Sequence, residues 1–178
     1  MKLLSLSRLS CALVFASLSF GAGAASRPGN ASTVCEARSS EVVRALIRAT
    51  NRARAEGRRC GTTFMAAAPR VRWSGELNRT AVRHSRDMAR NNFFDHTGSD
   101  GLQVWDRAQA AGYAYRNIGE NIAAGYPNVG RVQAGWLKSP GHCRNIMNPA
   151  YTQMAGRCVQ RAGSDYGSYW TVVFGRPQ

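Results

Sequence analysis

The feature that most narrows the fold of this 178-residue chain is a change of residue periodicity along its length. Apolar residues recur every three to four positions over residues 40–56, which predicts an amphipathic helix. Near the C-terminus, residues 151–160 and 168–174 are rich in β-forming side chains, and a turn at 163–167 separates them. Helices followed by a terminal antiparallel hairpin indicate an α+β domain, or a three-layer sandwich if helices cover both faces of the sheet.

Three further helices are predicted from the same periodicity and from their end signals. One begins after Ser74, a suitable N-cap. Its inner face is expected to carry Leu77, Ala81, His84, Ser85 and Met88. A third helix is expected over residues 102–111, and a fourth over residues 128–138, where Ser139 and Pro140 stop it.

The first 25 residues have the character of a secretory signal peptide. A basic start precedes a mostly apolar stretch, residues 9–20, and a small-residue cleavage site ends at Ala24. The apolar stretch is too short to span a bilayer. We therefore expect export, to the periplasm or out of the cell. Residues 26–39 are then a short lead-in, and residues 40–178 form one domain.

Four cysteines remain after the predicted processing: Cys35, Cys60, Cys143 and Cys158. An even number in an exported chain indicates two disulfides. No Cys-x-x-Cys pair points to a zinc site. A helix of about 16 residues between Cys35 and Cys60 would hold its ends about 24 Å apart, so these two are poor partners. We favour the pairs Cys60–Cys143 and Cys35–Cys158 over the other connectivities.

Positive charge is spread along the whole chain. Loss of Lys2 and Arg8 with the signal peptide lowers the formal net charge from +14 to +12, and Lys138 is then the only lysine. One interpretation is a basic envelope protein that binds anionic lipid or acidic polymers. The other, which we favour, is that the arginines are solvated helix faces that maintain solubility. We do not expect specific binding of nucleic acid. We expect the protein to be a monomer.

Three ionisable residues, His96, Glu120 and His142, form the candidate site. All three are predicted to lie in loops beside glycine or proline, which is where sites are usually built. If the loops converge, the carboxylate and the two imidazoles are suited to a divalent cation such as zinc, or to a general acid/base cluster. Each residue also has a structural interpretation, in which it braces its own loop.

Asn121 and Ser139 are the other residues expected at this cleft. Ser139, with His142 and Glu120, has the composition of a hydrolase triad, but the chain has no Gly-x-Ser-x-Gly turn. A thiol nucleophile is not expected, because the cysteines are assigned to disulfides. No catalytic residue is therefore assigned. His84 is interpreted as a hydrogen-bonded core histidine.

Six short motifs follow one another in order. They are His-Ser-x-Asp-Met-Ala from His84, Phe-Phe-Asp-His-Thr from Phe93, Ala-Gly-Tyr from Ala111, Gly-Glu-Asn-Ile from Gly119, Trp-Leu-x-Ser-Pro-Gly-His from Trp136 and Tyr-Trp-Thr-x-x-Phe-Gly from Tyr169. Together they resemble the bacterial branch of the CAP (SCP-like) superfamily, which holds the cysteine-rich secretory, antigen 5 and pathogenesis-related 1 proteins. The resemblance covers residues 42–175 and implies an α-β-α sandwich with a central antiparallel sheet and a surface cleft.

The resemblance also implies a cation site, with departures. Eukaryotic relatives often line the cleft with two histidines and two glutamates, and His96 and Glu120 match the first of each. Ala150 occupies the place of the second histidine, and residues 131–138 contain no acidic residue for the second glutamate. His142, from the Ser-Pro-Gly-His turn of the bacterial branch, is the candidate substitute.

Three functions are therefore considered. We favour an exported binding or effector module whose ligand, whether a lipid, a protein or an anionic polymer, is undetermined. The first alternative is a metal-assisted, protease-like hydrolase that uses His96, Glu120 and His142. The second is the basic envelope protein that binds acidic polymers. No common reaction unites the family that the chain resembles, so no enzymatic activity is assigned.

Overall fold

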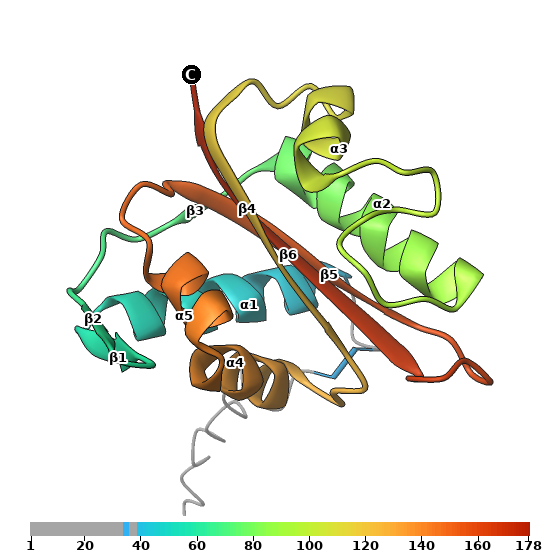
Figure 1. The fold of residues 1–178 in the computed structure, drawn as a ribbon, viewed down its shortest axis with the longest axis horizontal. Helices are drawn as coiled ribbons and strands as arrows, with labels where there is room; N and C mark the ends of the chain where they lie inside the picture. The colour runs from blue at the N-terminus through green and yellow to red at the C-terminus, as the bar shows by residue number, and fades with distance from the viewer. Residues whose placement is uncertain (1–33, 36–38) are drawn as a thin grey trace, which may run out of the picture.

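A computed structural model describes residues 34, 35 and 39–178, which form a sheet with helices on both faces (Figure 1). The predicted signal peptide and most of the lead-in lie outside the described residues. The helices are α1 (Ser39–Arg54), α2 (Gly75–Asn91), α3 (Val104–Ala110), α4 (Val129–Lys138) and α5 (Pro140–Met147). The strands are β1 (Arg58–Cys60), β2 (Thr63–Met65), β3 (Arg72–Trp73), β4 (Tyr115–Ala124), β5 (Gln153–Gln160) and β6 (Ser168–Pro177).

The main sheet has the strand order β3-β5-β6-β4. Strands β5 and β6 form the predicted antiparallel hairpin, with Gln160 opposite Ser168 next to the turn. Strand β4, which the sequence analysis did not predict, pairs antiparallel with β6. The short β3 pairs parallel with β5, so the sheet is mixed rather than wholly antiparallel.

Alternate side chains of β6 pack against the helices on opposite faces of the sheet. Trp170 and Phe174 pack into the cluster that includes residues of α1, α4 and α5. Val173 points the other way and packs against Leu77 of α2 and Ala108 of α3. Successive side chains of a strand point to opposite faces, and here both faces are covered. The expected three-layer α-β-α sandwich is confirmed (Figure 1).

Helix α2 forms as the sequence analysis predicts. The Ser74 hydroxyl caps its first turn by accepting a hydrogen bond of 3.2 Å from the Leu77 amide. The five residues expected on the inner face are all buried: Leu77, Ala81, His84, Ser85 and Met88. The helix therefore holds its apolar stripe against the sheet and turns its charged residues outward.

Helix α5 was not predicted. Helix α4 does end at Lys138, but Pro140 then occupies the first turn of a new helix instead of closing a turn. Proline is well suited to that position, because its fixed φ is helical and the first amides of a helix have no partner within it. The Cys143 amide donates a hydrogen bond of 2.8 Å to the Ser139 carbonyl, which forms the first turn of the helix.

The structure forms both disulfides that the sequence analysis favoured. Cys35 bonds to Cys158 of β5, and Cys60 of β1 bonds to Cys143 of α5, with Cα atoms 5.3 and 5.4 Å apart. The second bond ties the small β1–β2 hairpin to the helix that carries His142. In the part of the chain that the structure describes, no helix has the length and apolarity to cross a bilayer.

Candidate functional site

The three candidate site residues come from three kinds of element, and only one lies in a loop. His96 follows α2 in a loop, whereas Glu120 lies in β4 and His142 lies in α5. The prediction that all three are loop residues was therefore wrong for Glu120 and His142. They nevertheless line one pocket of about 420 Å³, together with Ser139, Gly141, Arg144 and Asn145.

Glu120 is the buried anchor of this pocket. Its carboxylate is 2% exposed, and each of its oxygens has a cationic or polar partner. Oε1 is 2.7 Å from Nδ1 of His96, and Oε2 accepts a hydrogen bond of 2.8 Å from the Arg107 guanidinium. A buried carboxylate needs such partners, because burial without them costs several kcal/mol.

Arg107 is the site residue that the sequence analysis missed. It is buried, and it also donates to the carbonyls of Leu102 at 2.5 Å and His96 at 3.1 Å. One guanidinium thus holds the Glu120 carboxylate, the backbone of His96 and the end of the loop before α3. The available signal was helical spacing, because Arg107 falls on the same α3 stripe as the buried Val104 and Ala108.

His84 lies under the site as a core residue, as expected. Its Nε2 is 2.9 Å from the Asp95 carbonyl oxygen and 3.9 Å from Oε1 of Glu120. Burial lowers the pKa of His84, which outweighs the raising effect of Glu120. The ring is therefore neutral at pH 7, and the longer contact is not an ion pair. With Nε2–H donated to Asp95, His84 supports the loop that leads into His96.

His142 faces the same pocket from α5 and is half-buried. Its pKa is lowered from the ordinary value, first by burial and then by the charge of His96 when that ring is protonated. The second cause means that the two imidazoles are close enough to repel when both are charged. His142 is accordingly neutral at pH 7.

Two asparagines connect α5 to β4 at the pocket, and Asn145 is also one of the lining residues. Asn121 is fully buried, and its amide donates to the His142 carbonyl at 3.1 Å. Asn145 donates to the Glu120 carbonyl at 3.1 Å and to Oδ1 of Asn121 at 3.0 Å. Asn121 therefore braces the site from below instead of lining the cleft. Side chains of one strand alternate, so Glu120 and Asn121 reach opposite layers.

Gly119 precedes Glu120 because a larger residue does not fit. A Cβ atom added there would overlap the hydroxyl group of Tyr151, which donates to the Ile118 carbonyl at 3.3 Å. The close approach of this ring to β4 explains the glycine of the Gly-Glu-Asn motif in physical terms.

Comparison with known proteins identifies the fold and the family. The sequence pattern of CAP, the cysteine-rich secretory protein family, matches residues 47–174. The chain belongs to the CAP family. A structure of an extracellular protein with an SCP domain from Bacillus anthracis str. Ames superposes with a TM-score of 0.61 at 28% identity, over 78% of this chain and 41% of that one. An outer surface protein of Borrelia burgdorferi shares the fold, with a TM-score of 0.57 at 21% identity, over 62% of this chain and 80% of that one.

A sequence relative is YkwD of Bacillus subtilis (strain 168), 35% identical over 98 residues, which are 55% of this chain and 36% of YkwD. The chain thus spans about a third of the length of that relative and under half of the B. anthracis protein. The family match therefore concerns the CAP domain alone.

This CAP domain lacks some of the side chains that a cation site with several protein ligands requires. Ala150 stands where the sequence analysis expects a second histidine, and its amide donates to Oδ1 of Asn148. Among the described residues, no three His, Cys, Asp or Glu side chains converge on one point. Glu120 is already engaged by His96 and Arg107, so the arrangement does not fit a centre with three protein ligands.

The residues of a hydrolase triad also fail to connect. Ser139 lines the pocket, but in the described part of the chain its hydroxyl makes no hydrogen bond to His142. A nucleophile and its base must lie within hydrogen-bond reach of each other. The geometry of this CAP domain therefore gives no support to the serine hydrolase alternative.

Proposed function

We propose that this protein is an exported binding module whose cleft takes a divalent cation between His96 and His142, with Glu120 as a positioning residue and not as a ligand. The observation that carries the proposal is the 2.7 Å contact between Nδ1 of His96 and Oε1 of Glu120. A metal-binding histidine typically donates its second ring N–H to a carboxylate, which fixes the tautomer and makes the other nitrogen more basic.

The tautomer of His96 follows from this contact. An ionised carboxylate only accepts hydrogen bonds, so the proton must sit on Nδ1. In the neutral ring the Nε2 lone pair is then free, on a side chain that is 51% exposed at a pocket of about 420 Å³. His96 therefore offers its free nitrogen to the space that His142 also lines.

Glu120 supports this geometry without ligating. Its carboxylate is 2% exposed, and both of its oxygens are bonded. Arg107 holds the carboxylate in one orientation, which in turn keeps His96 in one tautomer. This role differs from that of a carboxylate ligand, and it supports the two-histidine arrangement over the three-ligand one.

His142 supplies the second imidazole in the required protonation state. A ligand nitrogen must be unprotonated, and burial lowers the pKa of His142 below the usual range for histidine. Two imidazoles with water in the remaining positions make a weaker site than three or four protein ligands. We therefore expect modest affinity, suited to a cation that is exchanged or shared with a bound partner.

The proposal also includes export of the protein and binding without catalysis. Two disulfides are typical of proteins that work in oxidising compartments outside the cytoplasm. The solved B. anthracis relative is described as extracellular and the B. burgdorferi one as an outer surface protein. The pocket lacks a connected nucleophile and base, which favours binding over hydrolysis.

Calorimetric titration of the purified mature protein with zinc tests the proposal. We expect saturable binding of one ion, weakened at least tenfold by His96→Ala and by His142→Ala. Ser139→Ala is the matched control, because it lines the same pocket without being a histidine, and it should bind zinc as the wild type does. Glu120→Gln should weaken binding by about tenfold or more while leaving some, as for an outer-shell partner. Equal binding by wild type and both alanine variants would refute the site.

A further inference from the structure

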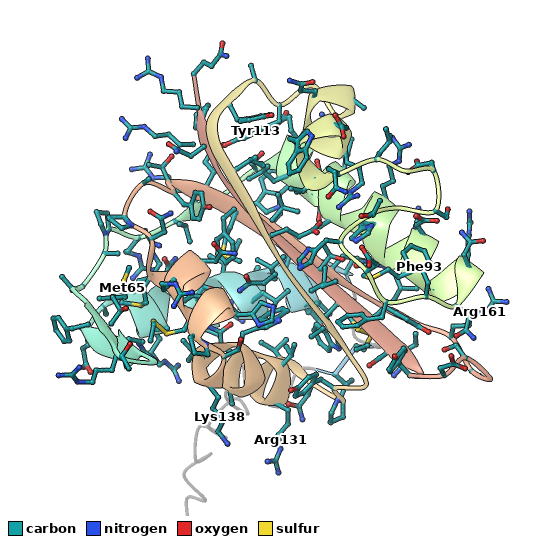
Figure 2. All side chains as sticks on the ribbon, viewed as in Figure 1. Met65, Phe93, Tyr113, Arg131, Lys138 and Arg161 are labelled. Atoms are coloured by element: carbon teal, nitrogen blue, oxygen red, sulfur yellow. A yellow bond between two sulfur atoms is a disulfide. The ribbon has the colours of Figure 1, made fainter. Side chains whose placement is uncertain are left out.

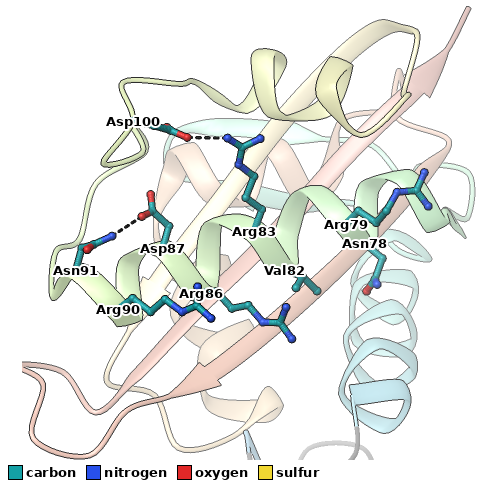
Figure 3. A pocket seen from close by; sticks show the side chains of 9 residues that line it. All are labelled: Asn78, Arg79, Val82, Arg83, Arg86, Asp87, Arg90, Asn91 and Asp100. Carbon is teal, nitrogen blue, oxygen red and sulfur yellow. Dashed lines mark hydrogen bonds and ion pairs between the residues drawn. The ribbon is translucent and has the colours of Figure 1, made fainter.

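The outer face of α2 carries a row of arginines on the opposite side of the helix from its buried stripe. Arg79, Arg83, Arg86 and Arg90 follow one another at steps of four, three and four residues, and all are exposed (Figure 3). Residues at these steps are neighbours on a helix surface, and the row extends about 16 Å along the axis. The row is thus a continuous line of positive charge.

A second row of positive charge lies beside the first, on β5 and just after it. The Arg157 side chain of β5 is close to Arg86, whose charge contributes to the lowered pKa of Arg157 after the effect of burial. Arg161 donates to the Arg90 carbonyl at 2.8 Å and extends into solvent (Figure 2). We define the arginine face as Arg79, Arg83, Arg86, Arg90, Arg157 and Arg161.

The arginine face is hollowed rather than flat. A pocket of about 560 Å³ runs along α2, and it is lined by the four arginines of the helix together with Asp87 and Asp100. Both carboxylates are already engaged. Asp87 accepts hydrogen bonds from the amide and hydroxyl of Ser99. Figure 3 shows that Asp87 also accepts from the Asn91 amide at 2.7 Å and that Asp100 accepts from Arg83 at 2.7 Å.

Arg79 forms an ion pair of 3.6 Å with Glu76, whereas the other four arginines of the face lack counter-charges. Within the described residues, no carboxylate lies within ion-pair distance of Arg86, Arg90, Arg157 or Arg161. Like charges at helical spacing destabilise a helix, so the clustering of these arginines carries a cost in the free protein. An anion that lies between the rows would remove this repulsion.

We propose that the arginine face binds a linear acidic polysaccharide, with its sulfate or carboxylate groups held by the guanidinium groups of both rows. Arginine presents its donors in a planar fork that matches carboxylate and related oxyanions in two parallel hydrogen bonds. A row of about 16 Å fits several successive sugar residues of an extended chain better than a single small anion. The hollow along the outer face of α2 gives the chain a path past the four arginines of the helix.

The shape of this face distinguishes a polymer from a membrane surface. A helix that lies on a membrane buries an apolar face among the lipids. The apolar face of α2 is already packed against the sheet, through Leu77, Ala81 and Met88, and the outer pocket presents charged and amide side chains with only Val82 among them. Nothing on this face is available to insert into lipid, so binding must be ionic.

The chain provides a matched control on α1. Arg44, Arg48 and Arg52 form another exposed row at helical spacing. Arg44→Gln/Arg48→Gln/Arg52→Gln removes the same charge as Arg86→Gln/Arg90→Gln/Arg161→Gln. All six positions are exposed, so both triple variants are expected to fold, which circular dichroism and thermal unfolding check.

The experiment measures binding of a short heparin oligosaccharide to the mature protein by calorimetry, at several salt concentrations. We expect the α2 variant to bind at least tenfold more weakly and with a shallower dependence on salt, because fewer counterions are displaced. The α1 variant should stay within about twofold of the wild type. Addition of a chelator, or the substitution His96→Ala, should leave heparin binding unchanged, which separates this surface from the cleft.

Two results would overturn the proposal. Equal weakening by the two triple variants would mean that net charge alone attracts the polymer. Binding of both the wild type and the α1 variant to phosphatidylglycerol vesicles, with no measurable affinity for heparin, would assign the face to a membrane instead.

Discussion

Arg54 offers the sharpest test of how this fold is held together. It is fully buried at the end of α1, and its guanidinium donates to four backbone carbonyls of distant segments. The acceptors are Pro69 at 2.7 Å, Ile146 at 2.7 Å, Asn148 at 2.9 Å and Tyr151 at 3.1 Å. One side chain therefore joins α1 to the segment before β3 and to the end of α5, the helix that carries His142.

The cost of replacing Arg54 by methionine can be estimated from these bonds. The carbonyls of Ile146 and Tyr151 are bonded in buried surroundings, and each loses its partner at about 1–3 kcal/mol. The other two acceptors are partly buried and can turn to water. Methionine also removes the penalty of burying a charge, a penalty that lowers the pKa of Arg54. We expect a net loss of about 2–4 kcal/mol.

Arg52→Met is the matched control, since Arg52 lies in the same last turn of α1 but is exposed. Its free energy of unfolding should change by less than about 0.5 kcal/mol. Urea unfolding with the disulfides intact should show Arg54→Met shifted to a midpoint lower by roughly 1–2 M. Overlapping unfolding curves for the two variants would refute the view that the carbonyl bonds of Arg54 stabilise the fold.

Two further predictions concern pH and the disulfides. Burial, helped by the charge of Glu76, raises the pKa of Tyr113 to about 12, so the folded protein keeps a proton that the unfolded chain loses near pH 10. The free energy of unfolding should therefore fall as the pH rises from about 10 to about 12. Tyr113→Phe should reduce this fall, and the same pH dependence in both proteins would exclude Tyr113 as its source. The double substitution Cys60→Ala/Cys143→Ala removes a bond between residues 83 apart in sequence, and it should lower stability by about 2–5 kcal/mol. Thermal unfolding checks this value, and an unchanged midpoint would contradict it.

Local patterns in the sequence were sufficient for much of the fold. The helices α1, α2, α3 and α4 and the β5–β6 hairpin were predicted because their apolar spacing and end signals agree with their tertiary environment. A length argument correctly excluded the pair Cys35–Cys60, because a helix keeps its two ends apart, although it did not decide between the two connectivities that remained. In these cases the information lies within a few residues, or in the rigidity of one element.

The elements that were missed depend on distant partners. Strand β4 contains the polar run from Arg116 to Asn121, and it becomes a strand by pairing along its length with the buried β6. Helix α5 begins with Pro140, which is compatible with a stop and with a first helical turn alike. Only the docking of α5 on β4, through Asn145 and Asn121, decides between these outcomes.

The difference between a carboxylate ligand and a carboxylate that positions a ligand is decided by a residue outside the recognised motifs. Glu120 was recognisable from its Gly-Glu-Asn context, but its chemistry depends on Arg107, 13 residues earlier, which takes one of its oxygens at 2.8 Å. With Arg107 in place, the carboxylate is compensated without a metal, and its other oxygen is committed to His96. Without that guanidinium, the same buried carboxylate would need another cation, and a metal ion would be a suitable one. In the proposed cation site, the identity of residue 107 therefore decides whether Glu120 can act as a ligand or only as a positioning residue.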